Sequence, residues 1–139
     1  MIEPPEFVDT NVLVYAYDRS SPAKRDRAVA LLERLMGERR LALSLQVLQE
    51  FYVVTTRKLP TPLSPEVARQ VLSDLGRAWR HEPTLRDVLE ASLLTERYRI
   101  SFWDALILRS AQALGAQVIW SEDLHPGAYG EVRVENPFA

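Results

Sequence analysis

The chain contains no cysteine, which excludes disulfides, thiolate metal ligands and a cysteine nucleophile. Long apolar runs are absent too, because no uncharged stretch reaches the roughly 20 residues that a membrane-spanning helix needs. Residues 1–6 lack both the basic region and the apolar region of a signal peptide. We therefore expect a soluble protein of the cytoplasm.

Neither sign of charge is in excess, since 17 Lys and Arg oppose 19 Asp and Glu for a net charge of −2. Whole-chain charge therefore does not predict a nucleic-acid binder. The sequence also has no GxGxxG, GxxxxGK[ST], GxSxG or HExxH motif, so dinucleotide-binding, P-loop, serine-hydrolase and zincin classes lose their usual support. With 139 residues, 47% of them hydrophobic, we expect one domain spanning residues 1–139.

Apolar segments alternate between strand and helix periods along the chain. Ser-Pro pairs at 21–22 and 64–65 and a capping-box pattern at 84–87 mark helix starts, and Gly115 marks a helix end. This order predicts an α/β domain with a mostly parallel sheet covered on both faces. We expect strands at 7–8, 41–45, 81–82, 117–120 and 132–134, helices at 12–17, 22–40, 45–58, 65–79, 84–97 and 102–114, and a loop at 121–130.

Four acidic residues fall where the chain is expected to be buried. Asp9 and Asp123 follow predicted strands, and ligands of parallel sheets bind outside the carboxyl ends of the strands. Glu50 and Asp104 lie inside apolar helices. An unpaired buried carboxylate costs several kcal/mol, so grouped acids indicate a bound cation, a basic partner or raised pKa values.

Each acid also has an ordinary structural explanation. Asp9 could cap the helix that follows it, and Asp104 could close a capping box with Ser101. Glu50 could belong to the one polar stripe of its helix, and Asp123 to a polar turn. The combination of all four at one edge of the sheet favours a shared site over four separate explanations.

The remaining candidates have weaker patterns. His81 lies shortly before Pro83 and His125 directly before Pro126, neither has metal-ligand spacing with a second histidine, and we expect surface roles for both. The pairs Arg39-Arg40 and Arg57-Lys58 fit ordinary charges at helix ends. Five aromatic residues occupy core-like positions, which favours packing over base stacking: Phe51, Tyr52, Phe102, Trp103 and Trp120.

The sequence resembles the PIN-domain ribonucleases, and especially the VapC-type toxins of toxin–antitoxin pairs. The resemblance depends on four ordered segments, at residues 7–11, 48–52, 101–107 and 120–124, and covers nearly the whole chain. It implies a three-layer α/β/α sandwich, a PIN-like fold. It also implies four residues that bind metal and take part in catalysis, namely Asp9, Glu50, Asp104 and Asp123. Asn11, Ser121 and Glu122 are implied as supporting residues.

The same resemblance implies one or two Mg²⁺ or Mn²⁺ ions, cleavage of RNA, a VapB-type antitoxin protein as partner, and a homodimer. The usual Thr of the fourth segment is Ser121 here, and Glu122 competes with Asp123 for the fourth position. Two alternatives stay open. One is a PIN-like module that binds RNA or protein without catalysis, and the other is a DNA-directed nuclease.

Overall fold

Six short strands form one sheet at the centre of the computed structural model, which describes residues 3–139. The order is β3-β2-β1-β4-β6-β5, and every pair is parallel except β5 with β6. Met1 and Ile2, part of the segment searched for a signal peptide, lie outside the described residues. The strands are β1 (Glu6–Val8), β2 (Leu41–Ser44), β3 (Trp79–His81), β4 (Val118–Trp120), β5 (Gly127–Tyr129) and β6 (Val132–Glu135).

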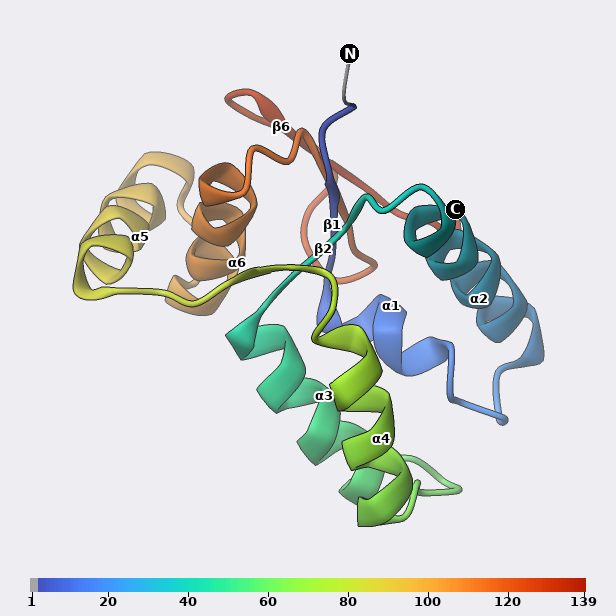
Figure 1. Ribbon diagram of the computed structural model, residues 1–139. Coiled ribbons are helices and arrows are strands. Elements are labelled where there is room, and N and C mark those ends of the chain that lie inside the picture. The colour runs from blue at the N-terminus through green and yellow to red at the C-terminus, as the bar shows by residue number, and fades with distance from the viewer. Residues whose placement is uncertain (1–2) are drawn as a thin grey trace.

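Helices cover both faces of this sheet (Figure 1). On one side α6 packs on the strands with α5 outside it, and on the other side lie α1 and α2. The α3–α4 pair extends beyond the edge where the parallel strands end. The helices are α1 (Thr10–Tyr15), α2 (Pro22–Gly37), α3 (Leu45–Arg57), α4 (Pro65–Leu75), α5 (Leu85–Tyr98) and α6 (Phe102–Ala113).

The mostly parallel α/β architecture predicted from the sequence is confirmed. Central strands β1 and β2 are buried along their whole length, as expected for strands with helices on both faces. Fully buried Phe7, Phe51 and Ile119 are among the largest side chains of the core. Among residues 3–139, no helix combines the length and apolarity needed to cross a membrane.

Several boundaries differ from the prediction by two or three residues, since α1 spans Thr10–Tyr15 and α2 ends at Gly37. The larger differences lie at the end of α4 and after β4. Helix α4 ends at Leu75, because Gly76 caps it, and Trp79 opens β3 in register with Ala42 of β2. The expected loop at 121–130 contains β5, which pairs with β6 through a two-residue turn beginning at Gly130. Gly130 has φ +66, a conformation that glycine adopts without strain and that suits such a turn.

Candidate active site

Asp9 lies where β1 meets α1, at the carboxyl edge of the sheet. Its Oδ1 accepts a hydrogen bond from the Thr10 backbone N–H at 2.8 Å, so Asp9 does cap α1. Its Oδ2 accepts from the Ser121 hydroxyl at 2.8 Å and from Asn11 Nδ2 at 3.2 Å. Asp9 can therefore cap α1 and belong to a site at the same time, because Oδ1 makes the capping hydrogen bond and Oδ2 contacts Ser121 and Asn11.

A pocket of about 410 Å³ opens beside Asp9. All four predicted acids line it, although they come from the end of β1, from α3, from the first turn of α6 and from the segment after β4. Asp18, which the sequence analysis did not single out, lines it as well. Of the predicted supporting residues, Asn11 and Glu122 line the pocket, and Ser121 is fully buried behind Asp9.

Glu50 is held by two side chains, although it lies on an exposed part of α3. Thr10 Oγ1 donates to Glu50 Oε2 at 3.2 Å, and Gln46 Nε2 donates to Glu50 Oε1 at 2.8 Å. The other polar atom of the Gln46 amide, Oε1, is buried and has no hydrogen-bond partner. The spacing of four residues between Gln46 and Glu50 on one helix was the sequence signal for this contact.

Asp104 enters the pocket from the start of α6. Its backbone N–H donates to Ser101 Oγ at 3.1 Å, which caps the helix. Within the described part of the chain its carboxylate accepts no hydrogen bond, so the full capping box considered for this segment is absent. Trp103, expected in the core, is 64% exposed and lines the pocket. An apolar residue in the first turn of a helix can face the core or the solvent, and the hydrophobic periodicity did not indicate which of the two Trp103 faces.

The two adjacent acids after β4 have different partners. Asn11 Nδ2 donates to Asp123 Oδ2 at 3.2 Å, and Asn11 Oδ1 accepts from the Glu122 backbone N–H at 3.0 Å. The Glu122 side chain forms an ion pair with Lys24. Lys24 also lies 4.7 Å from the centre of the Tyr15 ring. Glu122 therefore has a cation of its own, whereas Asp123 has a neutral donor.

Asp9 is the one acid lining the pocket that is buried. Burial raises the pKa of Asp9 to about 6. Hydrogen bonds from Ser121 and Thr10 lower this pKa, and the negative charges of Glu50 and Asp123 raise it. In residues 3–139 no ion pair involves Asp9, Glu50, Asp104 or Asp123.

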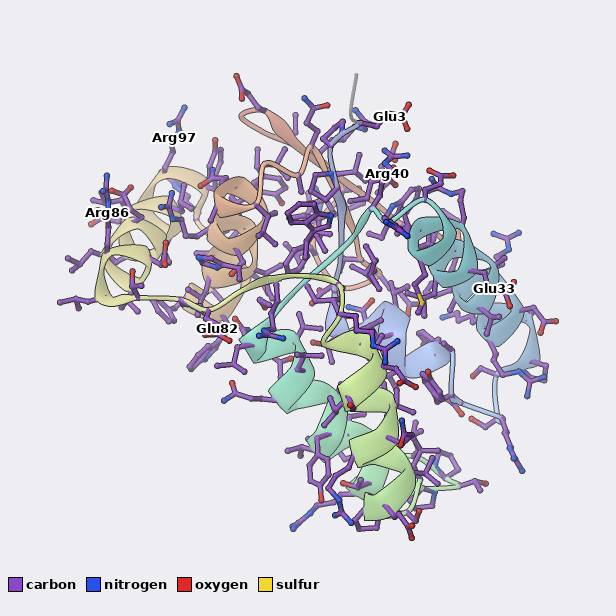
Figure 2. All side chains as sticks on the ribbon, viewed as in Figure 1. Glu3, Glu33, Arg40, Glu82, Arg86 and Arg97 are labelled. Atoms are coloured by element: carbon purple, nitrogen blue, oxygen red, sulfur yellow. The ribbon has the colours of Figure 1, made fainter. Side chains whose placement is uncertain are left out.

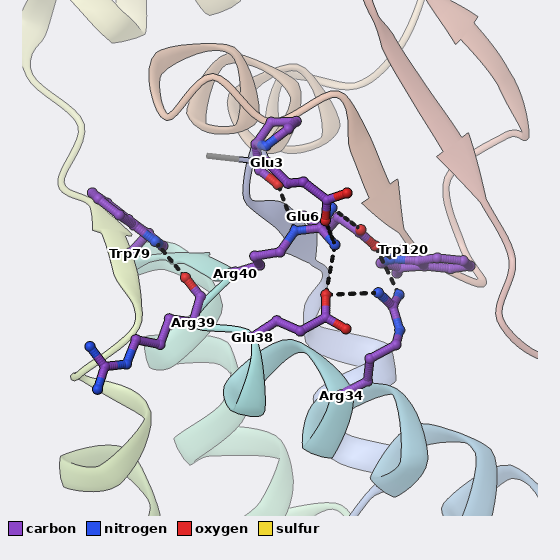
Figure 3. A network of polar contacts seen from close by, with 9 residues as sticks. Glu3, Glu6, Arg34, Glu38, Arg39, Arg40, Trp79 and Trp120 are labelled. Atoms are coloured by element: carbon purple, nitrogen blue, oxygen red, sulfur yellow. Dashed lines mark hydrogen bonds and ion pairs between the residues drawn. The ribbon is translucent and has the colours of Figure 1, made fainter. Parts of the chain in front are cut away.

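The opposite end of β1 provides a comparison, because Glu6 is also buried there. Arg40 Nη2 lies 2.6 Å from Glu6 Oε2, while Arg34 and Trp120 donate to Oε1 at 3.0 and 2.8 Å (Figure 3). Burial opposes ionisation of Glu6, but these donors and charges outweigh it and lower its pKa. Arg40 is thus not the ordinary helix-end charge predicted. Buried acids thus stand at both ends of β1, with Glu6 opening the strand and Asp9 directly following it, and within residues 3–139 only Glu6 is paired with arginine.

The two histidines take no part in the pocket. His125 is exposed, as predicted. His81 contradicts its surface assignment: it ends β3, is partly buried, and lies 2.8 Å from Ser110 Oγ and 3.1 Å from Asp87 Oδ2. Contacts between distant segments of this kind leave no local sequence pattern.

The pocket offers oxygen donors, namely carboxylates, amide oxygens and hydroxyls, which are the ligands that hard divalent cations prefer. In residues 3–139, no three acids or histidines stand close enough together to ligate one ion jointly. Mg²⁺ usually takes only one or two carboxylates and fills its other positions with water and substrate oxygens. The donor set therefore fits Mg²⁺ or Mn²⁺ without a cluster of three protein ligands.

Comparison with protein families gives a match over most of the chain. The model of the PIN domain matches residues 7–130. Among curated proteins, no sequence matches significantly.

Solved structures resemble the fold at low sequence identity. A toxin–antitoxin complex from Klebsiella pneumoniae superposes with a TM-score of 0.66 at 19% identity, over 85% of this chain and 86% of that one. VapC20 of Mycobacterium tuberculosis, a toxin that cleaves the sarcin–ricin loop, gives 0.62 at 19%, over 84% and 90%. DNA-bound VapBC from Salmonella typhimurium gives 0.62 at 16%, over 97% and 99%.

Proposed function

Since the chain belongs to the PIN domain family, we propose that it is a metal-dependent endoribonuclease and the toxin of a type II toxin–antitoxin pair. The observation that carries the proposal is the meeting of Asp9, Glu50, Asp104 and Asp123 around one pocket at the carboxyl edge of the sheet. The similar folds described as toxins or toxin–antitoxin complexes support the same assignment.

Asp9 and Asp123 would hold Mg²⁺ or Mn²⁺, with Glu50 and Asp104 completing the negative surroundings. Asp9 is the strongest candidate ligand, because it is buried, no cation pairs with it in the described part of the chain, and its pKa is raised to about 6. A cation beside it would favour the ionised form and reverse that rise. When bound, the ion supplies Lewis-acid chemistry, acidifying water and screening the negative charge of the phosphodiester.

The protein's own groups divide the remaining work. Ser121 and Asn11 fix the Asp9 carboxylate, and Thr10 and Gln46 fix that of Glu50. The Asp104 carboxylate accepts no hydrogen bond within the described residues, so it is free to take a proton from the attacking water. Neither histidine is needed as a base.

The expected partners follow from this function. RNA is the substrate, and an antitoxin protein of the VapB type covers the pocket in the inactive pair. A basic antitoxin side chain placed among these acids would compensate charges that no ion pair within residues 3–139 compensates. The family resemblance adds a homodimer.

The decisive experiment measures cleavage of single-stranded RNA by antitoxin-free protein with and without Mn²⁺. Asp9→Asn and Asp104→Asn should each abolish Mn²⁺-dependent cleavage, while Asp26→Asn, at an exposed position on α2, should keep wild-type activity. Calorimetry with Mn²⁺ alone should detect binding to the wild type and not to Asp9→Asn. Cleavage that survives in both pocket variants would overturn the proposal. The absence of both Mn²⁺ binding and cleavage in the wild type would favour a non-catalytic module.

A further inference from the structure

Trp103 is a large apolar side chain that stays exposed to solvent at the wall of the pocket. Its exposed fraction of 64% is the highest of the three tryptophans. Trp79 and Trp120 donate their indole N–H groups to a backbone carbonyl at 3.0 Å and to a carboxylate at 2.8 Å. Within residues 3–139 the indole N–H of Trp103 has no such partner. The ring of Trp103 is therefore available to a ligand.

The Trp103 ring is also held in place from one side. Phe102 contacts it edge to face, with 5.3 Å between the ring centres and 79° between the ring planes. Phe102 in turn packs against the buried cluster of Ala91, Ala105 and Leu106 between α5 and α6. A ring that is already held in place loses little conformational freedom when a flat ligand stacks on it.

The pocket offers no cationic side chain that could hold a nucleic-acid backbone. Six acidic side chains line it, and no lysine or arginine among the described residues does so. Arginines lie elsewhere, since Arg86 and Arg97 project outward from α5 and Arg40 lies beside Glu3 (Figure 2). Away from a bound cation the pocket therefore repels phosphate groups. Affinity for RNA then has to come from contacts to the uncharged bases.

Stacking of a base on an aromatic ring is a contact of this kind, because it involves the face of the base and not the charge of the phosphate. Among the described residues, Tyr15 is the one other aromatic side chain that lines the pocket. Its ring is already in use, because the Lys24 ammonium lies 4.7 Å from its centre and Phe138 contacts it at 5.0 Å. Trp103 is thus the ring on which a base can stack.

We propose that Trp103 stacks an unpaired base next to the scissile phosphate and thereby selects RNA whose bases are unpaired. The inference rests on the proposed nuclease function, because the scissile phosphate is located by the cation at Asp9 and Asp123. A base inside a duplex has both faces covered by its neighbours, whereas a base in a single strand or a loop can be splayed onto an aromatic side chain.

The first test measures RNA binding with Mn²⁺ in the Asp104→Asn variant, which should bind RNA without cleaving it. The probe is an oligouridine of about 12 nucleotides. Adding Trp103→Ala should raise the dissociation constant about fivefold or more, and Trp103→Phe, which keeps a ring, should raise it less. Trp79→Ala, at a 55% exposed tryptophan outside the pocket, is the matched control and should leave binding unchanged. Unchanged binding in Trp103→Ala would overturn the inference.

The second test separates stacking from a structural role of Trp103. An abasic oligomer of the same length keeps the sugars and phosphates, so Trp103→Ala should not weaken its binding. Oligouridine should quench the tryptophan fluorescence of Asp104→Asn and have much less effect when Trp103→Phe is added, since Trp79 and Trp120 then provide the emission. Equal weakening for both oligomers would overturn the stacking role.

Three outcomes separate this inference from the proposed function. Asp104→Asn protein that binds neither oligomer would overturn both of them. Oligouridine binding that does not depend on Trp103 would overturn the inference alone. If Trp103→Ala weakens antitoxin binding and leaves oligouridine binding unchanged, the ring contacts the antitoxin and not a base.

Discussion

The Ser121 hydroxyl donates a hydrogen bond of 2.8 Å to Asp9 Oδ2 across 112 positions of sequence. Both residues are buried, and each directly follows one of two neighbouring parallel strands, β4 and β1. The same hydroxyl oxygen accepts from the backbone N–H groups of Asp123 and Leu124, at 3.2 and 3.1 Å. Ser121 therefore fixes the Asp9 carboxylate and the segment that carries Asp123 together.

Ser121→Ala should weaken Mn²⁺ binding at pH 7 by about tenfold, the usual scale for losing a group that orients a ligand. The variant removes a donor that lowers the pKa of Asp9, so that pKa should rise further above 6 and binding should depend more steeply on pH. Calorimetry between pH 6 and 8 measures both effects. Ser121→Thr keeps the hydroxyl and is the control. Equal affinities in the two variants would contradict the role assigned to the hydroxyl.

Gln46→Met should lower the cleavage rate while leaving the fold intact. The change frees Glu50 from the 2.8 Å hydrogen bond to Gln46 Nε2 and also removes the buried, unpartnered Gln46 Oε1. Losing an unsatisfied buried acceptor does not destabilise a protein, so the melting temperature should be unchanged or higher. Single-turnover rates, compared with Gln49→Met at the exposed position nearby, provide the measurement. Identical rates in the two variants would show that Gln46 does not position Glu50.

Asp123→Asn should impair cleavage more than Glu122→Gln. Lys24 already neutralises Glu122, whereas within residues 3–139 the only side chain bonded to the Asp123 carboxylate is the neutral Asn11 amide. The unpaired carboxylate is the better cation ligand. Rates at saturating Mn²⁺, with melting curves to confirm folding, decide between the two acids. A larger loss of cleavage rate in Glu122→Gln than in Asp123→Asn would mean that Glu122, and not Asp123, is the fourth acid of the site.

The sheet and the shared edge of Asp9 and Asp123 were predictable because both depend on chain order. Parallel strands place their carboxyl ends at one edge, so an acid directly after a strand, such as Asp9, is located by topology alone. Glu50 and Asp104 needed the additional information of the resemblance, since a helix position does not state which neighbour it faces.

The sequence was less informative wherever a residue's partner comes from a distant segment. The ion pair of Lys24 with Glu122 and the burial of His81 against Ser110 connect elements that periodicity treats separately. Short elements were missed for another reason: β5 has three residues, and its only signal was the turn glycine Gly130. The exposure of Trp103 could not be predicted, because an apolar residue can line a pocket as well as pack in the core.

Asp87 has a buried structural role that the sequence did not predict, because its only local signal was the capping-box pattern at 84–87. It is buried between α5, α6 and β3. Its Oδ2 accepts from the Thr84 N–H at 2.8 Å and lies 3.1 Å from His81, and its Oδ1 accepts from Arg109 at 2.9 Å. The Thr84 backbone hydrogen bond is the largest cause that lowers the pKa of Asp87, to about 2, with Arg109 and His81 adding to it.

Asp87→Asn should destabilise the fold by about 3 kcal/mol at pH 7, because it leaves Arg109 without its buried anion. The ionised form of Asp87 is favoured in the folded state, so its contribution is complete above the ordinary carboxyl pKa near 4 and disappears as pH falls toward 2. Urea unfolding from pH 7 down to pH 2 should therefore show the wild type and Asp87→Asn converging below about pH 4. Asp26→Asn, at an exposed position, should follow the wild type throughout. If the difference in unfolding free energy between the wild type and Asp87→Asn stays constant with pH, the negative charge of Asp87 does not contribute to stability.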